Sequence, residues 1–262
     1  MEEAKPRIAI HKFTSCDGCQ LAFLHLGEDL LKLAEKVDIV HFVEMGPINP
    51  TAKVDVAYVE GSISTPEEAK RIREIRANSR YLVTIGACAT AGGIQALRNF
   101  ADTKSWMQAI YATPETISTL DTATAISNHV KVDYEIYGCP VNSQQVLASL
   151  LSLLQKVTPS ARRDKVCLEC KRLGYVCVMV AKGEPCMGPV THTGCGALCP
   201  SLGRGCYACY GPAENINTEA LTQWLSSLGL SDAEISRRFL FIQNSAPGFK
   251  EAGLKLKQKK TP

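Results

Sequence analysis

The chain lacks the features that mark exported, membrane-spanning and nucleic-acid-binding proteins. Its first residues, M-E-E-A-K-P-R, lead directly into a predicted strand and form no apolar signal segment. No uninterrupted apolar run reaches the roughly 20 residues that span a membrane. Charged residues make up 21% of the chain and the net charge is +3, which provides no strong field for nucleic acid. We therefore expect a cytoplasmic protein with no nucleic-acid partner and no membrane span.

The sequence also lacks the motifs of common catalytic sites. It contains no GxGxxG dinucleotide loop, no Walker phosphate loop and no serine nucleophile elbow. No pair of carboxylates indicates acid–base chemistry. The one basic cluster, residues 255–260, is interpreted as a solvated and partly frayed terminus. We expect no catalytic residue in this chain.

Cysteine, by contrast, is abundant, with 12 in 262 residues. In the cytoplasm, so many cysteines argue against disulfides and for metal ligands or redox chemistry. A chain of this length does not need disulfides to be stable. Twelve cysteines also divide into three sets of four, which is the ligand count of three cubane iron–sulfur clusters.

The first 160 residues alternate predicted strands with predicted helices. A threonine, a proline and two glutamates at 65–68 form a capping box that announces a helix. Residues 101–130 are interpreted as an insertion of helix and loop. Alternating strands and helices predict an α/β domain with a parallel sheet and right-handed crossovers. The predicted strands cover 7–13, 37–43, 54–59, 81–85 and 132–137, and further helices cover 20–36 and 142–156.

The character of the sequence changes near Pro159, which predicts two domains, 1–160 and 161–262. Residues 165–212 hold eight cysteines among many glycines and prolines, so we expect metal rather than an apolar core to organise them. Beyond them, Asn217 or Thr218 caps a predicted helix over 219–228, and Ser231 and Glu234 form a second capping box. These two helices are expected to pack on the cysteine-rich segment.

Four cysteines of the first domain follow predicted strands. Cys16 and Cys19 follow the first strand, Cys88 the fourth and Cys139 the fifth. The carboxyl ends of parallel strands share one edge of a sheet, where ligands bind. Neighbouring glycines would let the backbone approach closely and offer N–H groups to cluster sulfides. The residues favour an iron–sulfur cluster and leave zinc and a dithiol switch as alternatives.

The second domain carries eight cysteines bracketed by two CxxC pairs. The two pairs alone could hold one zinc, but four cysteines would then stay idle, whereas two clusters use all eight. Because ferredoxins interleave their ligands, spacing alone does not fix the partition. His192, between the sets, is interpreted as a polar loop residue rather than a donor to a cluster. In chain order the sets are Cys167, Cys170, Cys177 and Cys186, then Cys195, Cys199, Cys206 and Cys209.

Five motifs together resemble one known family. They are S-C-D-G-C-Q at 15–20, G-A-C-A-T-A-G-G-I at 86–94, Y-G-C-P at 137–140, E-P-C-M-G-P-V-T-H-T-G-C at 184–195 and G-C-Y-A-C at 205–209. Over nearly its whole length the chain resembles the small, electron-transfer subunit of nickel–iron hydrogenases. Within that family it is most similar to the delta subunit of cytoplasmic NAD(P)-linked hydrogenases, also called sulfhydrogenases.

The resemblance implies a flavodoxin-like domain followed by a loop-rich iron–sulfur domain. Exported members usually have histidine where Cys167 stands, and they often have proline beside the first medial cysteine and a 3Fe-4S cluster. Here G-C-G-A-L-C-P supplies Cys199 as a fourth medial ligand, so this chain is expected to hold three 4Fe-4S clusters. The implied ligands are Cys16, Cys19, Cys88 and Cys139 for the proximal cluster, Cys195, Cys199, Cys206 and Cys209 for the medial cluster, and Cys167, Cys170, Cys177 and Cys186 for the distal cluster.

The implied function is electron transfer without bond chemistry. A nickel–iron large subunit would split dihydrogen, and a flavin-containing NAD(P)-reducing subunit with a ferredoxin-like iron–sulfur subunit would receive the electrons. The small subunit of a methyl-viologen-reducing hydrogenase that feeds heterodisulfide reductase is an alternative. A zinc-structured assembly protein without redox function is another. A complex I proximal-cluster chain is disfavoured, because that chain has adjacent cysteines and no eight-cysteine domain.

Overall fold

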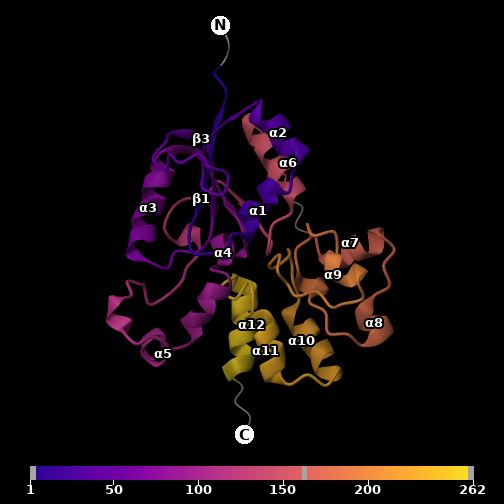
Figure 1. Cartoon of the computed structure of the whole chain (residues 1–262). Helices are drawn as coiled ribbons and strands as arrows, with labels where there is room; N and C mark the ends of the chain where they lie inside the picture. Colours follow the sequence, from indigo (N-terminus) through magenta and orange to yellow (C-terminus); the bar gives the residue numbers. More distant parts are fainter. Residues whose placement is uncertain (1–3, 161–163, 259–262) are drawn as a thin grey trace. The chain divides into compact units, whose positions relative to one another are not determined.

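The computed structural model describes residues 4–160 and 164–258, which form two compact units (Figure 1). The N-terminal unit comprises residues 4–136 and 140–160, and the C-terminal unit comprises residues 137–139 and 164–258. The short segment 137–139 thus belongs to the C-terminal unit although it follows the last strand of the other. The predicted boundary between residues 160 and 161 borders residues outside the described ranges and stays a prediction.

The N-terminal unit is built on one five-stranded sheet whose paired strands all run parallel. The strand order is β2-β1-β3-β4-β5, which is the order of flavodoxin-like folds. The predicted α/β fold class is therefore confirmed. The strands are β1 (Arg7–Lys12), β2 (Asp38–Phe42), β3 (Val54–Glu60), β4 (Ser79–Ile85) and β5 (Tyr134–Ile136).

Helices cover both faces of this sheet, because alternate strand residues point to opposite sides. Ile8 and Ile10 of β1 pack with Phe23 and Leu150 on one face. Ala9 of β1 belongs to the cluster on the other face, which α3 covers with two isoleucines. The helices are α1 (Gly18–Leu24), α2 (Glu28–Ala34), α3 (Pro66–Ala77), α4 (Gly86–Ala91), α5 (Thr103–Ile110) and α6 (Ser143–Leu154).

Two sequence predictions for helices have opposite outcomes. The capping box is confirmed: the Glu68 N–H donates to Thr65 Oγ1 at 3.1 Å, and the Thr65 N–H donates to Glu68 Oε2 at 3.2 Å. The single helix predicted over 20–36 is wrong, because Gly27 adopts φ 56° and ψ −121° and separates α1 from α2. Such a conformation is open to glycine and interrupts the helical hydrogen bonds.

The expected insertion between β4 and β5 consists of helical turns and loops. Residues 101–130 contain α5 and the 3-10 helices η2 (Pro114–Thr116) and η3 (Ile126–Asn128). A further 3-10 helix, η1 (Ile94–Phe100), lies between α4, which carries Cys88, and the insertion.

The C-terminal unit has its own apolar core. Leu225 of α10, Phe239 of α11 and Phe249 of α12 pack with Val166 and Met187 of the cysteine-rich segment. The two predicted helices thus pack on that segment as expected, and their caps Asn217 and Ser231 are confirmed. The helices are α7 (Val166–Arg172), α8 (Val178–Lys182), α9 (Leu198–Ser201), α10 (Thr218–Ser227), α11 (Asp232–Phe239) and α12 (Pro247–Gln258), with the 3-10 helix η4 (Gly188–Val190).

Two expectations for this unit are corrected. The cysteine-rich segment does contribute to an apolar core, since Val166, Val178 and Val190 are buried in it. Residues 255–258 of the basic cluster lie on α12, where Leu256 is buried. The interpretation of these residues as a frayed terminus is therefore wrong. Residues 259 and 260 lie outside the described ranges. None of the described helices is long and apolar enough to span a membrane.

Candidate metal centres

Three strands of the N-terminal unit end together at one edge of the sheet. Lys12 of β1 is in register with Glu60 of β3, and Glu60 is in register with Ile85 of β4. The loop with Cys16 follows β1, and α4 with Cys88 follows β4 directly. The structure thus brings the segments that carry Cys16, Cys19 and Cys88 to the same edge, as the sequence predicted.

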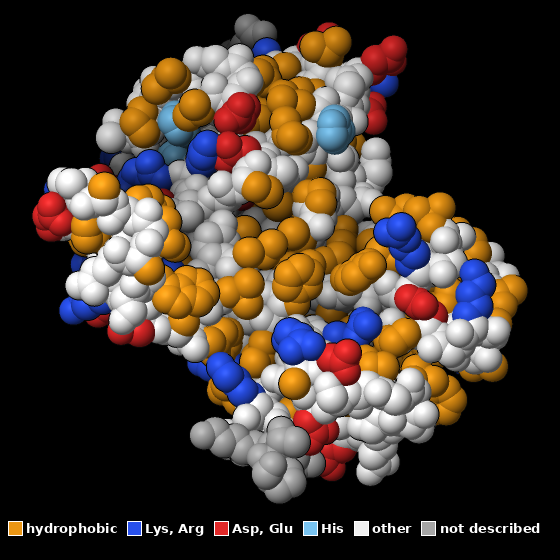
Figure 2. Space-filling model, turned by 60° about the horizontal axis from the view of Figure 1, so that its bottom comes forward, with side chains coloured by type: hydrophobic (Ala, Val, Ile, Leu, Met, Phe, Trp, Pro, Cys, Tyr) orange, Lys and Arg blue, Asp and Glu red, His pale blue; other side chains and the backbone are white. Residues whose placement is uncertain are grey.

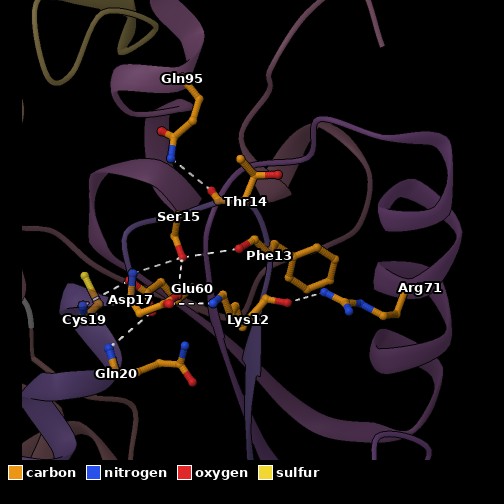
Figure 3. Close-up of polar contacts among 10 residues, drawn as sticks. All are labelled: Lys12, Phe13, Thr14, Ser15, Asp17, Cys19, Gln20, Glu60, Arg71 and Gln95. Carbon is orange, nitrogen blue, oxygen red and sulfur yellow. Dashed lines mark hydrogen bonds and ion pairs between the residues drawn. The ribbon is translucent and has the colours of Figure 1, made fainter. Parts of the chain in front are cut away.

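A buried carboxylate lies beneath the first of these loops (Figure 3). Glu60 is only 2% exposed, and its two carboxylate oxygens accept the backbone N–H groups of Cys19 at 3.0 Å and Gln20 at 3.2 Å. Burial raises the pKa of Glu60, and these hydrogen bonds oppose the rise. The carboxylate fixes the first turn of α1, and with it the backbone of Cys19.

Further polar contacts hold the turn around Cys16 (Figure 3). Asp17 has a left-handed backbone with φ 66°, and its carboxylate pairs with Lys12 and accepts the Ser15 hydroxyl at 3.1 Å. Gln95 Nε2 donates to the carbonyl oxygen of Thr14 at 3.1 Å. Because Gln95 follows α4, this bond ties the segment after Cys88 to the loop that contains Cys16.

Two glycines leave space for the thiols. A Cβ on Gly93, which has φ +63°, would lie 2.6 Å from Cys88 Sγ. A Cβ on Gly18 would lie 3.4 Å from Cys16 Sγ. A side chain at position 93 would therefore clash with the Cys88 thiol, whereas 3.4 Å at Gly18 is an ordinary van der Waals contact.

Cys139, the fourth predicted proximal ligand, belongs to the C-terminal unit. There it neighbours Cys209, a predicted medial ligand. Burial first, and then neighbouring cysteines including Cys139, raise the pKa of the Cys209 thiol to about 12, although a hydrogen bond with the Cys139 backbone opposes the rise.

The four predicted distal ligands lie around α7 and α8. Cys167 and Cys170 are on α7, and Cys177 is the residue before α8. Burial first, and then the other three cysteines of this set, raise the pKa of Cys170 to about 11. A Cβ on Gly188 would lie 3.3 Å from Cys186 Sγ and 3.6 Å from Cys167 Sγ. The structure therefore gathers these four cysteines in one region.

The predicted medial ligands also gather. Besides burial, Cys195 and Cys199 raise the pKa of Cys209, and Cys209 in turn raises the pKa of Cys206. The two sets touch at one point, where the Cys206 N–H donates to the sulfur of Cys186 at 3.1 Å. The partition of the eight ligands itself stays a prediction.

Backbone N–H groups point at several of these sulfurs. Cys186 Sγ accepts the Gly188 N–H at 3.4 Å in addition to that of Cys206, and Cys206 Sγ accepts the Ala208 N–H at 3.4 Å. Such bonds stabilise thiolates and tune the potentials of iron–sulfur clusters. The donor set therefore suits a cluster.

One carboxylate that the sequence analysis did not single out joins the two sets. Glu169 lies on α7 between Cys167 and Cys170 and accepts the N–H groups of Gly194 at 2.8 Å and Ala197 at 3.1 Å. Its Oε2 is 4.0 Å from Cys195 Sγ. The only sequence signal was its place inside the C-x-x-C pair.

Burial raises the pKa of Cys167, Cys186, Cys195 and Cys206, so these thiols would lose protons on binding a metal. The alternative of a dithiol switch at Cys16 and Cys19 stays open. Within residues 4–160 and 164–258, no three His, Cys, Asp or Glu side chains lie close enough to share a single metal ion. The ligands of a four-iron cluster bind separate irons, so they need not share one.

His192 lies outside the helices and strands of the C-terminal unit, as interpreted, but it is buried. It is 7% exposed, its backbone N–H donates to the Gly211 carbonyl at 2.9 Å, and its ring centroid lies 5.6 Å from that of Tyr137. Its interpretation as a residue that does not donate to a cluster stays a prediction.

The sequence of this chain matches a known protein family. Residues 16–153, which are more than half of the chain, match the family described as NADH ubiquinone oxidoreductase, 20 Kd subunit. The chain belongs to this family. The match to the 20 Kd subunit family ends at residue 153, before the segment with eight cysteines. Similarity over that segment therefore comes from individual relatives that align with more of the chain.

Three proteins that are similar to this chain are subunits of hydrogenases. Sulfhydrogenase 2 subunit delta of Pyrococcus furiosus is 35% identical over 88% of this chain and 97% of its own length. One subunit of the F420-non-reducing hydrogenase vhu of Methanococcus voltae is 27% identical over 81% of this chain and 84% of its own. A chain of an NAD+-reducing [NiFe]-hydrogenase structure is 27% identical with a TM-score of 0.56, over 60% of this chain and 96% of that one.

These likenesses confirm the resemblance to small subunits of nickel–iron hydrogenases. Within the 20 Kd subunit family, the chain groups with hydrogenase subunits that do not carry the catalytic centre. That the chain holds no catalytic residue of its own stays a prediction.

Proposed function

We propose that the chain is the electron-transfer subunit of a nickel–iron hydrogenase and holds three 4Fe-4S clusters. The observation that carries the proposal is the gathering of eight cysteines in the C-terminal unit, most of them buried or half-buried, with backbone N–H groups directed at their sulfurs. The proposed ligands are Cys16, Cys19, Cys88 and Cys139 (proximal), Cys195, Cys199, Cys206 and Cys209 (medial), and Cys167, Cys170, Cys177 and Cys186 (distal).

The chain's own residues would bind the clusters, orient the ligands and tune the cluster potentials. The cysteine thiolates would hold iron, and the clusters, when bound, supply one-electron transfer. Glu60 holds the backbone of Cys19, and Glu169 holds the loop with Cys195. The N–H groups of Gly188 and Ala208 stabilise sulfur charge. Because burial raises the thiol pKa values, cluster binding would displace protons from these cysteines.

The proposed partners lie at the two ends of this relay. A nickel–iron large subunit would dock at the sheet edge that carries the proximal ligands and deliver electrons from dihydrogen. A flavin-containing NAD(P)-reducing subunit and a ferredoxin-like iron–sulfur subunit would accept them from the distal cluster. The similarity to a sulfhydrogenase delta subunit and to a chain of an NAD+-reducing hydrogenase supports this arrangement, as well as a cytoplasmic location.

A second candidate function follows from the similarity to a subunit of an F420-non-reducing hydrogenase. In that case the chain would serve a methyl-viologen-reducing hydrogenase that feeds heterodisulfide reductase. The two candidates differ in the acceptor that co-purifies. A flavin subunit that binds NAD(P) favours the first.

Elemental analysis of the native complex, purified without oxygen by a tag on this chain, tests the proposal. We expect about twelve irons with matching sulfide for this chain, and nickel from a co-purifying subunit. Because partner subunits add iron, the chain expressed alone serves as the control. Zinc without nickel or sulfide would instead support the zinc-structured assembly protein.

A further inference from the structure

A cavity of about 530 Å³ lies along one side of α11 in the C-terminal unit. This volume is within the range of pockets that hold organic groups of drug size. The lining residues from α11 and its two flanks are Leu230, Glu234, Arg237, Arg238 and Phe241. The other lining residues come from the cysteine-rich segment and are Pro185, Met187 and Tyr207.

Two aromatic side chains of this lining are partly exposed to solvent. Phe241 is 43% exposed and Tyr207 is 47% exposed. Figure 2 shows hydrophobic side chains beside Lys, Arg, Asp and Glu side chains over α10, α11 and α12, in the lower part of the view. Aromatic residues, methionine and arginine are enriched at protein interfaces. The cavity lining has this composition, so we expect a protein surface to cover it.

Four of the lining residues have the spacing of a seam between two packed helices. Leu230, Glu234, Arg237 and Phe241 follow one another at intervals of four, three and four residues. Helices that pack side by side along their axes contact one another through such a stripe. Glu234 and Arg237 are exposed, and Leu230 is half-buried. The stripe therefore offers a partner helix two charges in its middle and an apolar side chain at each end.

The order of these four residues makes the stripe complementary to itself. A two-fold axis midway between Glu234 and Arg237 relates two antiparallel α11 helices. It places Glu234 of each copy opposite Arg237 of the other, and Leu230 of each copy opposite Phe241 of the other, so every contact forms twice. A parallel pair of α11 helices would bring like charges together. A partner with charges of a single sign would be repelled by one of the two central residues.

The charges around the stripe are also of both signs. Within α11, Asp232 stands in the first turn and Arg238 in the last turn, which repeats the order of the central pair. The cavity therefore has no rim of one sign that would select a strongly acidic or strongly basic protein. Exposed charges on the neighbouring elements include the basic Lys182, Arg204 and Lys250 and the acidic Glu184 and Glu251.

We propose that a second copy of this chain covers the cavity, with the two α11 helices antiparallel and Phe241 of each copy in the cavity of the other. Exposed ion pairs add little affinity, so the apolar contacts supply most of it, and the two pairs between Glu234 and Arg237 fix the antiparallel register. The Oε2 atom of Glu234 also accepts the Ser231 N–H at 2.9 Å, and a carboxylate has further lone pairs for a guanidinium. This association does not depend on which metal the cysteines bind.

Co-purification of two differently tagged copies of the full chain, expressed together in the native complex, tests the proposal. Wild-type copies should purify together. Arg237→Glu in both copies places carboxylates opposite each other and should reduce the amount of the second copy that is retained at least about tenfold, and Glu234→Arg in both copies should do the same. One copy with Arg237→Glu and one copy with Glu234→Arg are complementary again and should purify together, which misfolded variants would not do.

The apolar part of the contact is tested at the exposed aromatic residues. Phe241→Ala should raise the Kd between two copies at least about tenfold, as measured by sedimentation of the complex over a range of concentrations. Trp224→Ala, at an aromatic residue of α10 that is 44% exposed and does not line the cavity, is the matched control and should leave the Kd unchanged. The metal content per chain should stay at the wild-type level in every variant.

Wild-type copies that do not purify together would overturn the proposal. Full retention of the second copy when both carry Arg237→Glu would overturn it as well, because the copies would then be joined elsewhere. Failure of the mixed pair to purify together would show that the stripe serves a different protein, and loss of another subunit from the Arg237→Glu complex would assign the stripe to that subunit; either result rejects pairing of two α11 helices.

Discussion

Glu60 and Glu169 show how single carboxylates shape the two cysteine regions. Each accepts two backbone N–H groups from a loop that carries a proposed ligand, Cys19 in one case and Cys195 in the other. Hydrogen bonds from backbone donors to a carboxylate are stronger than neutral ones. Each carboxylate therefore fixes the backbone beside a proposed ligand and places a negative charge near it.

Glu169→Gln separates these two effects. Glutamine retains an acceptor for one N–H group and nearly the same volume but removes the charge 4.0 Å from Cys195 Sγ. A unit charge at that distance is worth at least about 1 kcal/mol, so the potential of the proposed medial cluster should rise by about 40 mV or more. Redox titration followed by EPR measures this shift. Glu219→Gln, at an exposed carboxylate on α10, should leave the potential unchanged; an equal shift there would remove the special role of Glu169.

His11 provides a pH-dependent contribution to stability. Burial first, and then neighbouring His41 and Arg71, lower its pKa to about 3. Between pH 6.5 and 3 the unfolded chain binds a proton at His11 that the folded chain does not, so stability falls as the pH falls through that range. The loss between pH 7 and pH 5 is about 2 kcal/mol for this residue.

Denaturant unfolding of wild type and His11→Leu at pH 7 and pH 5 measures this contribution. The variant should lose about 2 kcal/mol less on acidification than wild type does. His25→Gln, at an exposed histidine, should lose the same unfolding free energy between pH 7 and pH 5 as wild type does. Equal losses in wild type and His11→Leu would show that His11 is protonated in the folded chain.

At the scale of elements, the turn between α4 and η1 controls Cys88. Gly93 has φ +63° and ψ −158°, a conformation that is essentially limited to glycine, and Gly174 has φ +70°, so alanine strains the backbone at both positions, by about 1–3 kcal/mol at Gly93. Only at Gly93 would the new Cβ meet a thiol, at 2.6 Å from Cys88 Sγ, whereas at Gly174 nothing lies within 4 Å. Gly93→Ala should therefore lose the proximal cluster signal in EPR, and Gly174→Ala should keep it. Loss in both variants would assign the effect to backbone strain alone.

Elements with local signals were predictable from the sequence. β3 and β4 are rich in β-branched, aromatic and other apolar residues, and α3 starts with a capping box, so each is recognised without its neighbours. The break at Gly27 was missed because the leucines on both sides keep a helical spacing. α12 was missed although Phe249, Gly253 and Leu256 share one buried face, since the lysines near its end suggested a solvated tail.

The candidate cysteines were predictable from local sequence, whereas the two glutamates that hold their backbone were not. A cysteine after a strand or in a C-x-x-C pair is visible in the chain itself. The role of Glu60 depends on which backbone N–H groups reach the end of β3, and that of Glu169 on a loop 25 residues away. Neither periodicity nor motif spacing carries such tertiary information.

For the whole molecule, the proposed relay makes its three clusters act in series, so a change at the middle one affects the complete path. Cys199 lies in the first turn of α9, where a helix tolerates proline. Cys199→Pro removes one proposed ligand of the medial cluster. We expect conversion toward a 3Fe-4S cluster, which generally has a higher potential than a 4Fe-4S cluster.

A higher potential of the medial cluster would hold electrons there. Dihydrogen-driven reduction of the acceptor should then slow by about tenfold for each 59 mV by which the medial potential rises above that of the next cluster. Hydrogen–deuterium exchange at the nickel–iron centre needs no relay and should be unchanged, which makes it the internal control. EPR should show a 3Fe signal, with about eleven rather than twelve irons per chain. Twelve irons and an unaltered spectrum in an assembled complex would reject the partition of the eight cysteines, because Cys199 would then not be a ligand of any cluster.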